Sequence, residues 1–184
     1  DDSGAEQARA RVATPQGDYR GALHTIANLI DRIDPNPGRG TAIGIGIPGT
    51  ISPATGLIKN ANSTWLIGRQ FDRDLSAYLG RPVRVANDAN CFAVSEATDG
   101  AGADGTTVFG VIVGTGVGGG LVHRGQALIG ANAISGEWGH TPLPWMTEEE
   151  FPGPECFCGR RGCIETFISG PAIARDHAAR FGGE

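Results

Sequence analysis

The sequence predicts an α/β fold, because apolar β-forming segments alternate with segments of helical periodicity. Residues 41–47, TAIGIGI, alternate isoleucine with small residues, and residues 106–114, TTVFGVIVG, form an apolar run typical of a buried strand. The stretch 18–33 is amphipathic, with apolar side chains at near-helical spacing: Leu23, Ile26, Ala27, Ile30 and Ile33. Of the 184 residues, 40% are hydrophobic and 19% are charged, which is typical of a globular chain with a sizeable core.

Most of these elements have their own start or stop signal. Asp18 can cap the first helix, the breaker DPNPGRG at 34–40 ends it, and Pro48-Gly49 turns the chain after the first strand. A proline at the first helical position, in Gly170-Pro171, starts a final helix. The elements expected between these points are a loop at 57–67, a helix at 72–79 with Asp72 as a possible cap, a strand at 82–86, a turn at Asn87, a helix at Ala89–Ala97, and a hairpin of strands at 106–114 and 118–125.

Composition excludes several classes of protein. The formal net charge of −5 leaves no basic footprint for nucleic acid or an anionic membrane surface. The sequence has no apolar run of about 18 residues and does not open with a secretory signal pattern. We therefore expect a cytoplasmic protein without nucleic-acid or membrane partners. Because the chain begins without methionine and ends close to a helix-like segment, we also expect it to be part of a longer protein.

Three of the four cysteines crowd into CFCGRRGC at 156–163, at the end of an irregular stretch, 131–162. So long an irregular segment needs something other than a hydrophobic core to hold it. Without a secretory signal, clustered thiols indicate a metal site before disulfides. Tetrahedral zinc needs a fourth ligand beside the three thiolates, and His140 is the natural candidate. Buried free thiols are the alternative, and Cys91 stands apart in an apolar setting.

Glycine is abundant, with 30 residues, and five of them lie in the run GTGVGGG at 114–120. The run contains G-x-G-x-x-G, but a dinucleotide fingerprint requires a helix directly after the glycines. Here β-forming residues and further glycines follow, so Rossmann-type binding is rejected. A glycine-rich turn after a buried strand can still present consecutive N–H groups to phosphate oxygens. The alternative is a plain tight turn.

Two pairs of polar residues are candidates for a ligand site. Asn87 and Asp88 stand between a strand and a helix, where ligands gather in α/β proteins. Asp88 could accept a proton from a substrate hydroxyl, or it could simply cap the helix. Glu137 and His140 put a carboxylate and an imidazole three residues apart. That pair alone is weak evidence, because a lone histidine is more often a hydrogen-bonded residue than a ligand.

Together these motifs resemble the ROK family of sugar kinases and sugar-sensing repressors. The similarity extends from about residue 12 to 178. Its segments are IGIPGTISPATGLIKNANSTW within 43–65, NDANC at 87–91, GTGVGGG at 114–120, GEWGH at 136–140 and CFCGRRGCIET at 156–166. Within the family, KNANSTWL, VSEATDGA and HTPLPWM most resemble bacterial fructokinases and manno(fructo)kinases.

The resemblance implies an actin-like, ribonuclease H-like fold, with mixed sheets, flanking helices and a zinc-bound loop. Residues 1–86 would form most of the N-terminal lobe, and residues 87–184 the start of the C-terminal lobe. The implied reaction transfers the γ-phosphate of ATP, with Mg²⁺, to a hexose hydroxyl, with fructose preferred over mannose or glucose. A homodimer is also implied. This sequence lacks the D-x-G-G-T phosphate loop and the C-terminal segment of these kinases, so we expect turnover from the whole protein rather than from this chain alone.

The resemblance also assigns roles to residues, and Asp88 would be the general base. The sugar hydroxyls would be bound by Gly49, Thr50, Asn62, Asn87, Asp88, Glu137, His140 and Glu165. The nucleotide phosphates would lie on Gly114, Thr115, Gly116, Gly118, Gly119 and Gly120. A structural zinc would be bound by His140, Cys156, Cys158 and Cys163.

Two other functions compete with the kinase. One is the sugar-binding effector domain of a ROK-type repressor, and the other is a zinc-stabilised sugar-binding remnant without catalysis. The presence of Asp88 and of the full glycine run favours the kinase. Residues upstream of Asp1 would discriminate, since D-x-G-G-T indicates a kinase and a basic helix-turn-helix indicates a repressor.

Overall fold

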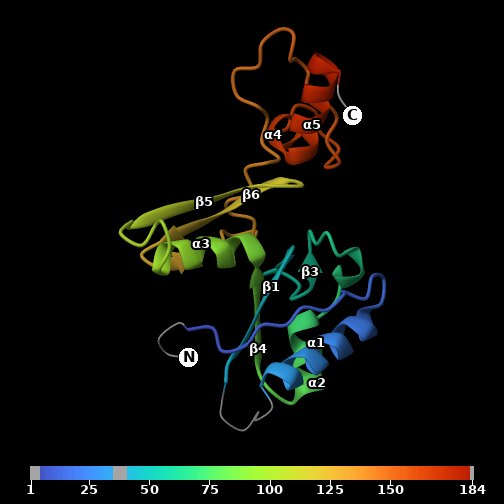
Figure 1. Ribbon diagram of the computed structural model, residues 1–184, viewed down its shortest axis with the longest axis vertical. Helices are drawn as coiled ribbons and strands as arrows, with labels where there is room; N and C mark the ends of the chain where they lie inside the picture. Colours follow the sequence, from blue (N-terminus) through green and yellow to red (C-terminus); the bar gives the residue numbers. More distant parts are fainter. Residues whose placement is uncertain (1–4, 35–40, 183–184) are drawn as a thin grey trace. The chain divides into compact units, whose positions relative to one another are not determined.

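The structure, a computed structural model, describes residues 5–34 and 41–182. The chain divides into two compact units, Asp1–Asn87 and Asp88–Glu184, which can be followed by colour in Figure 1. Each unit combines helices with its own strands, which confirms the α/β class. The breaker predicted at 34–40 lies, except for Asp34, outside the described residues.

Two parallel strands form the centre of the first unit. β1 (Ile43–Ile47) pairs with β4 (Val83–Asn87), with Ile43 opposite Val83 and Ile47 opposite Asn87. The connection between them contains α2 (Phe71–Leu79), and α1 (Tyr19–Ile33) precedes both strands. Figure 1 shows α1 and α2 side by side. Parallel strands joined through a helix are the βαβ arrangement that the alternating pattern predicts.

The first helix begins where its sequence signal predicts. Asp18 precedes α1, and its side chain accepts a hydrogen bond from the Gly21 N–H at 2.9 Å. The helix buries one side against the core of the first unit, whose most enclosed side chains are Phe71, Leu75 and Ile58. Burying a large apolar side chain contributes about 1.5–3 kcal/mol, so this core holds both helices against the strands.

Three local predictions in the first unit are wrong. Residues 57–67 are not a simple loop, because β3 (Ile58–Lys59) pairs antiparallel with β2 (Thr50–Ile51) and a 3₁₀ turn, η2 (Thr64–Leu66), follows. Asp72 does not cap α2, because the helix already begins at Phe71, whose side chain is only 2% exposed. No turn separates β4 from the next helix: Asn87 ends the strand, and α3 begins at Asp88.

An antiparallel hairpin and a helix form the first part of the second unit. β5 (Thr107–Val113) pairs with β6 (Val117–His123), and β7 (Gln126–Ala127) adds to β6. Figure 1 shows α3 (Asp88–Thr98) along the hairpin. The approach is close, since a Cβ on Gly120 would lie 2.6 Å from the Ala89 carbonyl oxygen. Glycine is therefore required at this position for packing alone.

The remainder of the second unit confirms the predicted irregular stretch. Within the described part of the chain, residues 131–162 contain no regular helix or strand. An isolated bridge pairs Pro142 with Cys163, and α4 (Glu165–Ile168) and α5 (Gly170–Phe181) follow. Ser169 caps α5 by accepting from the Ala172 N–H at 3.3 Å. None of the described helices is long and apolar enough to cross a membrane.

Candidate functional site

Two carboxylates and an imidazole of the second unit, those of Asp88, Glu165 and His140, lie close enough to Glu137 to shift its pKa. The pKa of Glu137 is raised overall, chiefly by partial burial. The nearby His140 lowers this pKa, and the negative charges of Asp88 and Glu165 raise it. Asp88 begins α3, Glu137 and His140 belong to the irregular stretch, and Glu165 begins α4. The fold thus gathers polar groups from separate segments, which is the usual construction of a ligand site.

The loop that carries Glu137 lies flat against the backbone of β6. Gly136 has a φ of +88°, and a Cβ there would lie 2.5 Å from the Gly119 carbonyl oxygen. Trp138 donates its indole N–H to the Gly118 carbonyl oxygen at 2.7 Å and packs edge-on against Phe109. These contacts fix Glu137 beside the glycine run.

The glycine run divides into a turn and a strand. Gly114 and Thr115 are exposed in the hairpin turn, where consecutive N–H groups could meet phosphate oxygens. Gly119 is buried within β6, and a Cβ on it would lie 2.5 Å from the Gly110 carbonyl oxygen. Glycine at 119 and 120 is therefore explained by strand and helix packing, whether or not a nucleotide binds.

The predicted sugar residues of the first unit gather at the carboxyl ends of β1 and β4. The Asn87 side-chain amide donates to the Gly49 carbonyl oxygen at 3.2 Å, and the Asn62 backbone N–H donates to the Pro48 carbonyl oxygen at 3.2 Å. Thr50 follows Gly49 at the start of β2. Gly49 has a φ of +147°, and a Cβ there would lie 2.9 Å from Ala61. Glycine at position 49 is therefore explained by the backbone conformation and the close approach of Ala61, whether or not a sugar binds there.

His140 and the three clustered cysteines present their ligand atoms within 4.8 Å of one another. The Cys158 and Cys163 sulfurs are 3.7 Å apart, and His140 Nδ1 lies 3.4 Å from the Cys156 sulfur. Two sulfurs bound to one tetrahedral zinc at about 2.3 Å stand about 3.8 Å apart, so the spacing fits zinc. A disulfide would need about 2.05 Å. This set could hold a metal.

The thiols of this cluster differ in their acidity. Burial and the neighbouring thiols raise the pKa of Cys163 to about 12. Hydrogen bonding, chiefly from the Arg160 backbone, lowers the pKa of Cys158 to about 6. Crowded thiols resist joint ionisation, and a divalent cation among them removes that resistance.

A model of the ROK family matches residues 1–180. The chain belongs to the ROK family. It is 44% identical over 164 residues to an N-acetyl-D-glucosamine kinase of Yersinia enterocolitica, covering 87% of this chain and 54% of that protein. The chain therefore spans about half the length of the curated relatives that it matches.

Solved structures of ROK proteins have the same fold. A ROK hexokinase from Thermus thermophilus matches with a TM-score of 0.76 at 34% identity, over 93% of this chain and 55% of that one. A ROK transcriptional regulator, a homologue of the Escherichia coli Mlc protein, matches with a TM-score of 0.71 at 27% identity, over 88% of this chain and 41% of the other. These likenesses confirm the predicted actin-like ROK fold.

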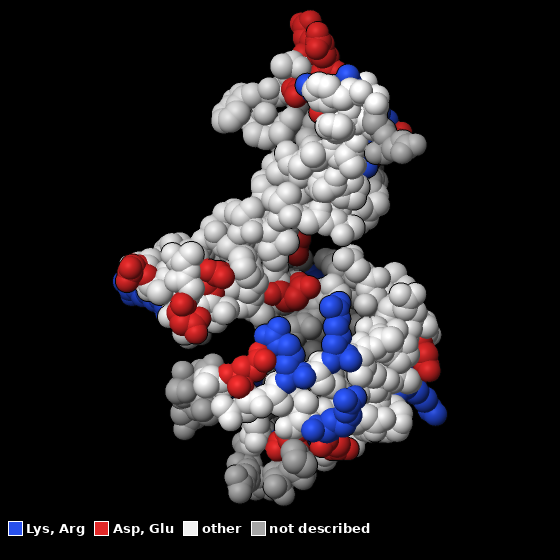
Figure 2. Space-filling view, viewed as in Figure 1, with Lys and Arg blue, Asp and Glu red and all other residues white. Residues whose placement is uncertain are grey.

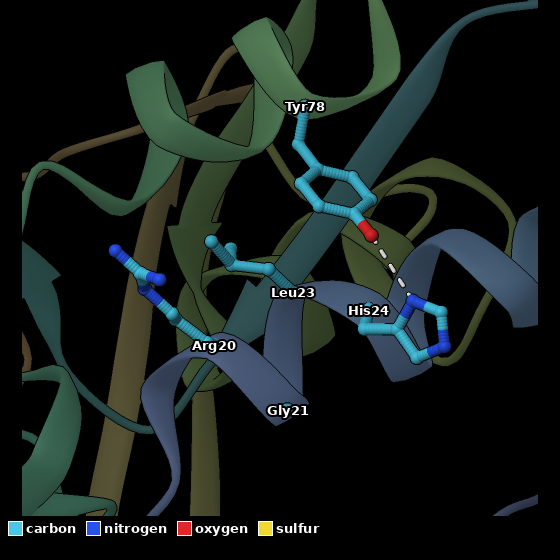
Figure 3. Close-up of a pocket in the computed structure, with 5 residues that line it drawn as sticks. All are labelled: Arg20, Gly21, Leu23, His24 and Tyr78. Carbon is cyan, nitrogen blue, oxygen red and sulfur yellow. Dashed lines mark hydrogen bonds between the residues drawn. The ribbon is translucent and has the colours of Figure 1, made fainter.

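A hollow of about 510 Å³ on the first unit of this ROK chain is lined by none of the predicted site residues. It lies along α1 and α2 and is lined by Arg20, Gly21, Leu23, His24 and Tyr78 (Figure 3). His24 Nδ1 is 3.0 Å from the Tyr78 hydroxyl, and His24 Nε2 is 3.1 Å from the Asn28 amide. The Nδ1 contact joins α1 to α2, whereas the Nε2 contact lies within α1. Because both ring nitrogens are engaged by protein groups, we assign this hollow no ligand.

Two features of the ROK site were missed by sequence reasoning. The first is the Trp138 hydrogen bond to β6, and the second is a hydrogen bond from the Val117 N–H to Glu165 Oε2 at 2.9 Å. A tryptophan between two glycines in GEWGH was the available signal for the first. The hydrogen bond between Val117 and Glu165 joins residues far apart in the chain, and no local sequence pattern indicates it.

Glu137→Gln is expected to stabilise the folded chain. Its carboxylate has a pKa above the ordinary 4.5, chiefly because of burial, so ionisation there opposes folding. The variant should gain up to about 1 kcal/mol at pH 7, a modest figure because the exposed part of the side chain is screened by solvent. The gain should fade as the pH falls through the raised pKa of the folded state and should vanish below the ordinary value, where both states are protonated. Urea unfolding at pH 7 and pH 4 measures the difference.

Glu148→Gln is the matched control for that experiment, since Glu148 is exposed in the same unit. It should leave the free energy of unfolding unchanged at both pH values. Equal free energies of unfolding for Glu137→Gln and the wild type at pH 7 would contradict the expectation that ionisation of Glu137 opposes folding.

Proposed function

We propose that this chain forms most of the N-terminal lobe and the start of the C-terminal lobe of an ATP-dependent hexose kinase. The observation that carries the proposal is the gathering of Asp88 and Glu165 around Glu137 in the second unit, with Glu165 hydrogen-bonded to the Val117 N–H at the end of the glycine turn. Carboxylates suit sugar hydroxyls because each carboxylate oxygen accepts more than one hydrogen bond. Because the chain spans about half the length of its relatives, the activity is proposed for the whole protein.

In this proposal Asp88 takes the proton of the attacking hydroxyl. Glu137, His140 and Glu165 of the second unit bind the sugar, together with a group in the first unit: Gly49, Thr50, Asn62 and Asn87. The nucleotide phosphates are received by residues of the glycine run: Gly114, Thr115, Gly116, Gly118, Gly119 and Gly120. Phosphoryl transfer depends mainly on positioning and charge neutralisation, so one base, a phosphate-binding turn and Mg²⁺ brought with ATP are sufficient.

The charge of the second unit supports the need for Mg²⁺. That unit contains twelve Asp and Glu residues against five Lys and Arg, whereas the first unit contains eight against ten. On the face shown in Figure 2, most basic side chains lie on the first unit. An acidic surface repels phosphate groups, so a divalent cation would have to accompany ATP at the glycine turn.

Zinc has a structural role in the proposal, held by His140, Cys156, Cys158 and Cys163. With four protein ligands, such a site has no open position for catalysis. His140 turns Nδ1 toward the Cys156 sulfur, which would leave Nε2 for a sugar hydroxyl. A metal-bound imidazole keeps its orientation, so zinc would hold both His140 and the neighbouring Glu137 in place.

The identity of the sugar is the finer part of the proposal. The motifs KNANSTWL and HTPLPWM favour fructose, whereas the Yersinia relative is named an N-acetyl-D-glucosamine kinase. These acceptors differ by a few polar groups, and pocket shape decides among them. The fructose preference and the homodimer remain predictions.

A sugar panel on the full-length protein tests the function. Fructose, mannose, glucose and N-acetylglucosamine are each supplied with ATP and Mg²⁺, and ADP release and the sugar phosphate are measured. We expect one sugar to exceed the others in kcat/KM by at least about tenfold, which corresponds to roughly 1.4 kcal/mol of transition-state binding. No sugar phosphate above the ATP hydrolysis background would contradict the kinase proposal.

The repressor effector domain is the second candidate, and the similarity to the Mlc-like regulator favours it. A regulator should bind DNA in a manner that depends on sugar and should form no sugar phosphate. Sugar-dependent DNA binding by the full-length protein, without turnover in the panel, would replace the kinase by this function.

A further inference from the structure

The turn of the glycine run is held at both ends by the segment that contains α4 and α5. At one end the Val117 N–H donates to Glu165 Oε2 at 2.9 Å, and at the other the Gly170 N–H donates to the Gly114 carbonyl oxygen at 2.8 Å. Val117 is only 5% exposed, so its N–H depends on a protein partner. The turn is therefore positioned from outside its own hairpin.

Glu165 lies directly over this turn. A Cβ on Gly116 would be 2.6 Å from Glu165 Oε2, whereas a Cβ on Gly114 would have nothing within 4 Å. A hydrogen bond to an ionised acceptor is about twice as strong as one between neutral groups. Among the described residues, no hydrogen bond ends on the second oxygen, Oε1, which leaves it for a further donor.

We propose that Glu165 is a positioning residue that couples sugar binding to the glycine turn. The inference rests on the proposed kinase function, in which Glu165 binds a sugar hydroxyl. One carboxylate would then hold the turn through Oε2 and the sugar through Oε1. A bound sugar fixes the carboxylate and, through the Val117 N–H, fixes the turn that receives the nucleotide.

The consequence is that sugar and nucleotide bind cooperatively. A turn already ordered by the sugar loses less conformational freedom when the nucleotide binds. The coupling is reciprocal, so the nucleotide tightens sugar binding by the same factor. A factor of about five or more is expected, at the lower end of typical coupling between sites.

Two glycine variants of the full-length protein separate this role from plain sugar binding. Gly116→Ala places a methyl group against Glu165, and Gly114→Ala makes the same change two residues away in open space. Both lie in the run proposed for the nucleotide, so both can weaken nucleotide binding. The deciding quantities are the sugar KM and the coupling factor, measured as the ratio of AMPPNP Kd values without and with saturating sugar.

We expect Gly116→Ala to raise the sugar KM about fivefold or more and to bring the coupling factor close to 1. Gly114→Ala should change both quantities less than about twofold. Glu165→Gln keeps the volume of the side chain and a neutral acceptor for the Val117 N–H, so it should fold and retain a reduced coupling factor above 1. It serves as the second measurement if Gly116→Ala does not fold.

The outcomes distinguish failure of the coupling from failure of the kinase proposal. A wild type that phosphorylates no sugar would overturn the proposed function and the inference with it. A wild type that phosphorylates a sugar but has the same AMPPNP Kd with and without that sugar would overturn the coupling alone. So would a Gly116→Ala or Glu165→Gln protein that raises the sugar KM but keeps the full wild-type coupling factor, because Glu165 would then be a sugar ligand and nothing more.

Discussion

Asp88→Asn is expected to lower kcat of the full-length protein by about 10²–10⁴, the usual contribution of a general base. Asn has nearly the same size as Asp but cannot take the proton of the attacking hydroxyl. Asp88 Oδ1 accepts a hydrogen bond from the Ala89 N–H at 2.8 Å, and the Asn carbonyl oxygen can accept the same bond. The start of α3 should therefore persist, and the sugar KM should change little.

The measurement is steady-state kinetics with the preferred sugar, together with a thermal unfolding scan of each protein. Asp104→Asn is the matched control, because Asp104 is an exposed residue in the turn after α3. It should retain kcat and the unfolding temperature of the wild type. A nearly normal kcat for Asp88→Asn would leave Asp88 with only its role at the start of the helix.

Cys163→Ser is expected to release the metal and unfold the stretch before α4. The Cys163 side chain is 1% exposed, and its backbone bridges to Pro142, within the irregular stretch. Structural zinc contributes about 10–16 kcal/mol of apparent binding free energy in small zinc domains. Loss of one thiolate should remove enough of it that the segment no longer folds around the ion.

Elemental analysis and limited proteolysis measure the two parts of this result. The full-length wild type, purified without chelator, should contain about one zinc per chain, and Cys163→Ser should contain almost none. Proteases should cut the variant within 141–162 much faster than the wild type. Cys91→Ser is the control, because Cys91 lies on α3 outside the cluster, and it should keep both zinc and resistance. A zinc-free wild type would contradict the site.

Sequence patterns predicted the elements whose stabilising contacts are local. Asp18 and the apolar spacing after it predicted α1, and the structure has that helix from Tyr19 to Ile33. The irregular stretch was predicted from its lack of periodicity. The cluster of possible metal ligands could be inferred because three of its members lie within eight residues, so chain connectivity already keeps them close.

Sequence patterns failed where a contact elsewhere decides the local structure. The two-residue strands β2 and β3 are too short to have a period of their own, and their pairing with each other defines them. Asp72 is a good capping residue, but burial of Phe71 moves the start of α2 ahead of it. At Asp72, tertiary packing outweighs a local capping preference that is worth about 1 kcal/mol.

By itself the sequence determined the family, the α/β class and the spacing of the clustered cysteines, and the family resemblance suggested roles for Asp88, Glu137 and Glu165. Only the tertiary structure decided that these carboxylates share an environment, that Gly119 and Gly120 are needed for packing, and that Glu165 holds the Val117 N–H. The physical reason is the separation along the chain of the residues that make each contact. Helix caps, strand alternation and ligand spacing depend on neighbours within a few residues, whereas these contacts join segments that only packing brings together.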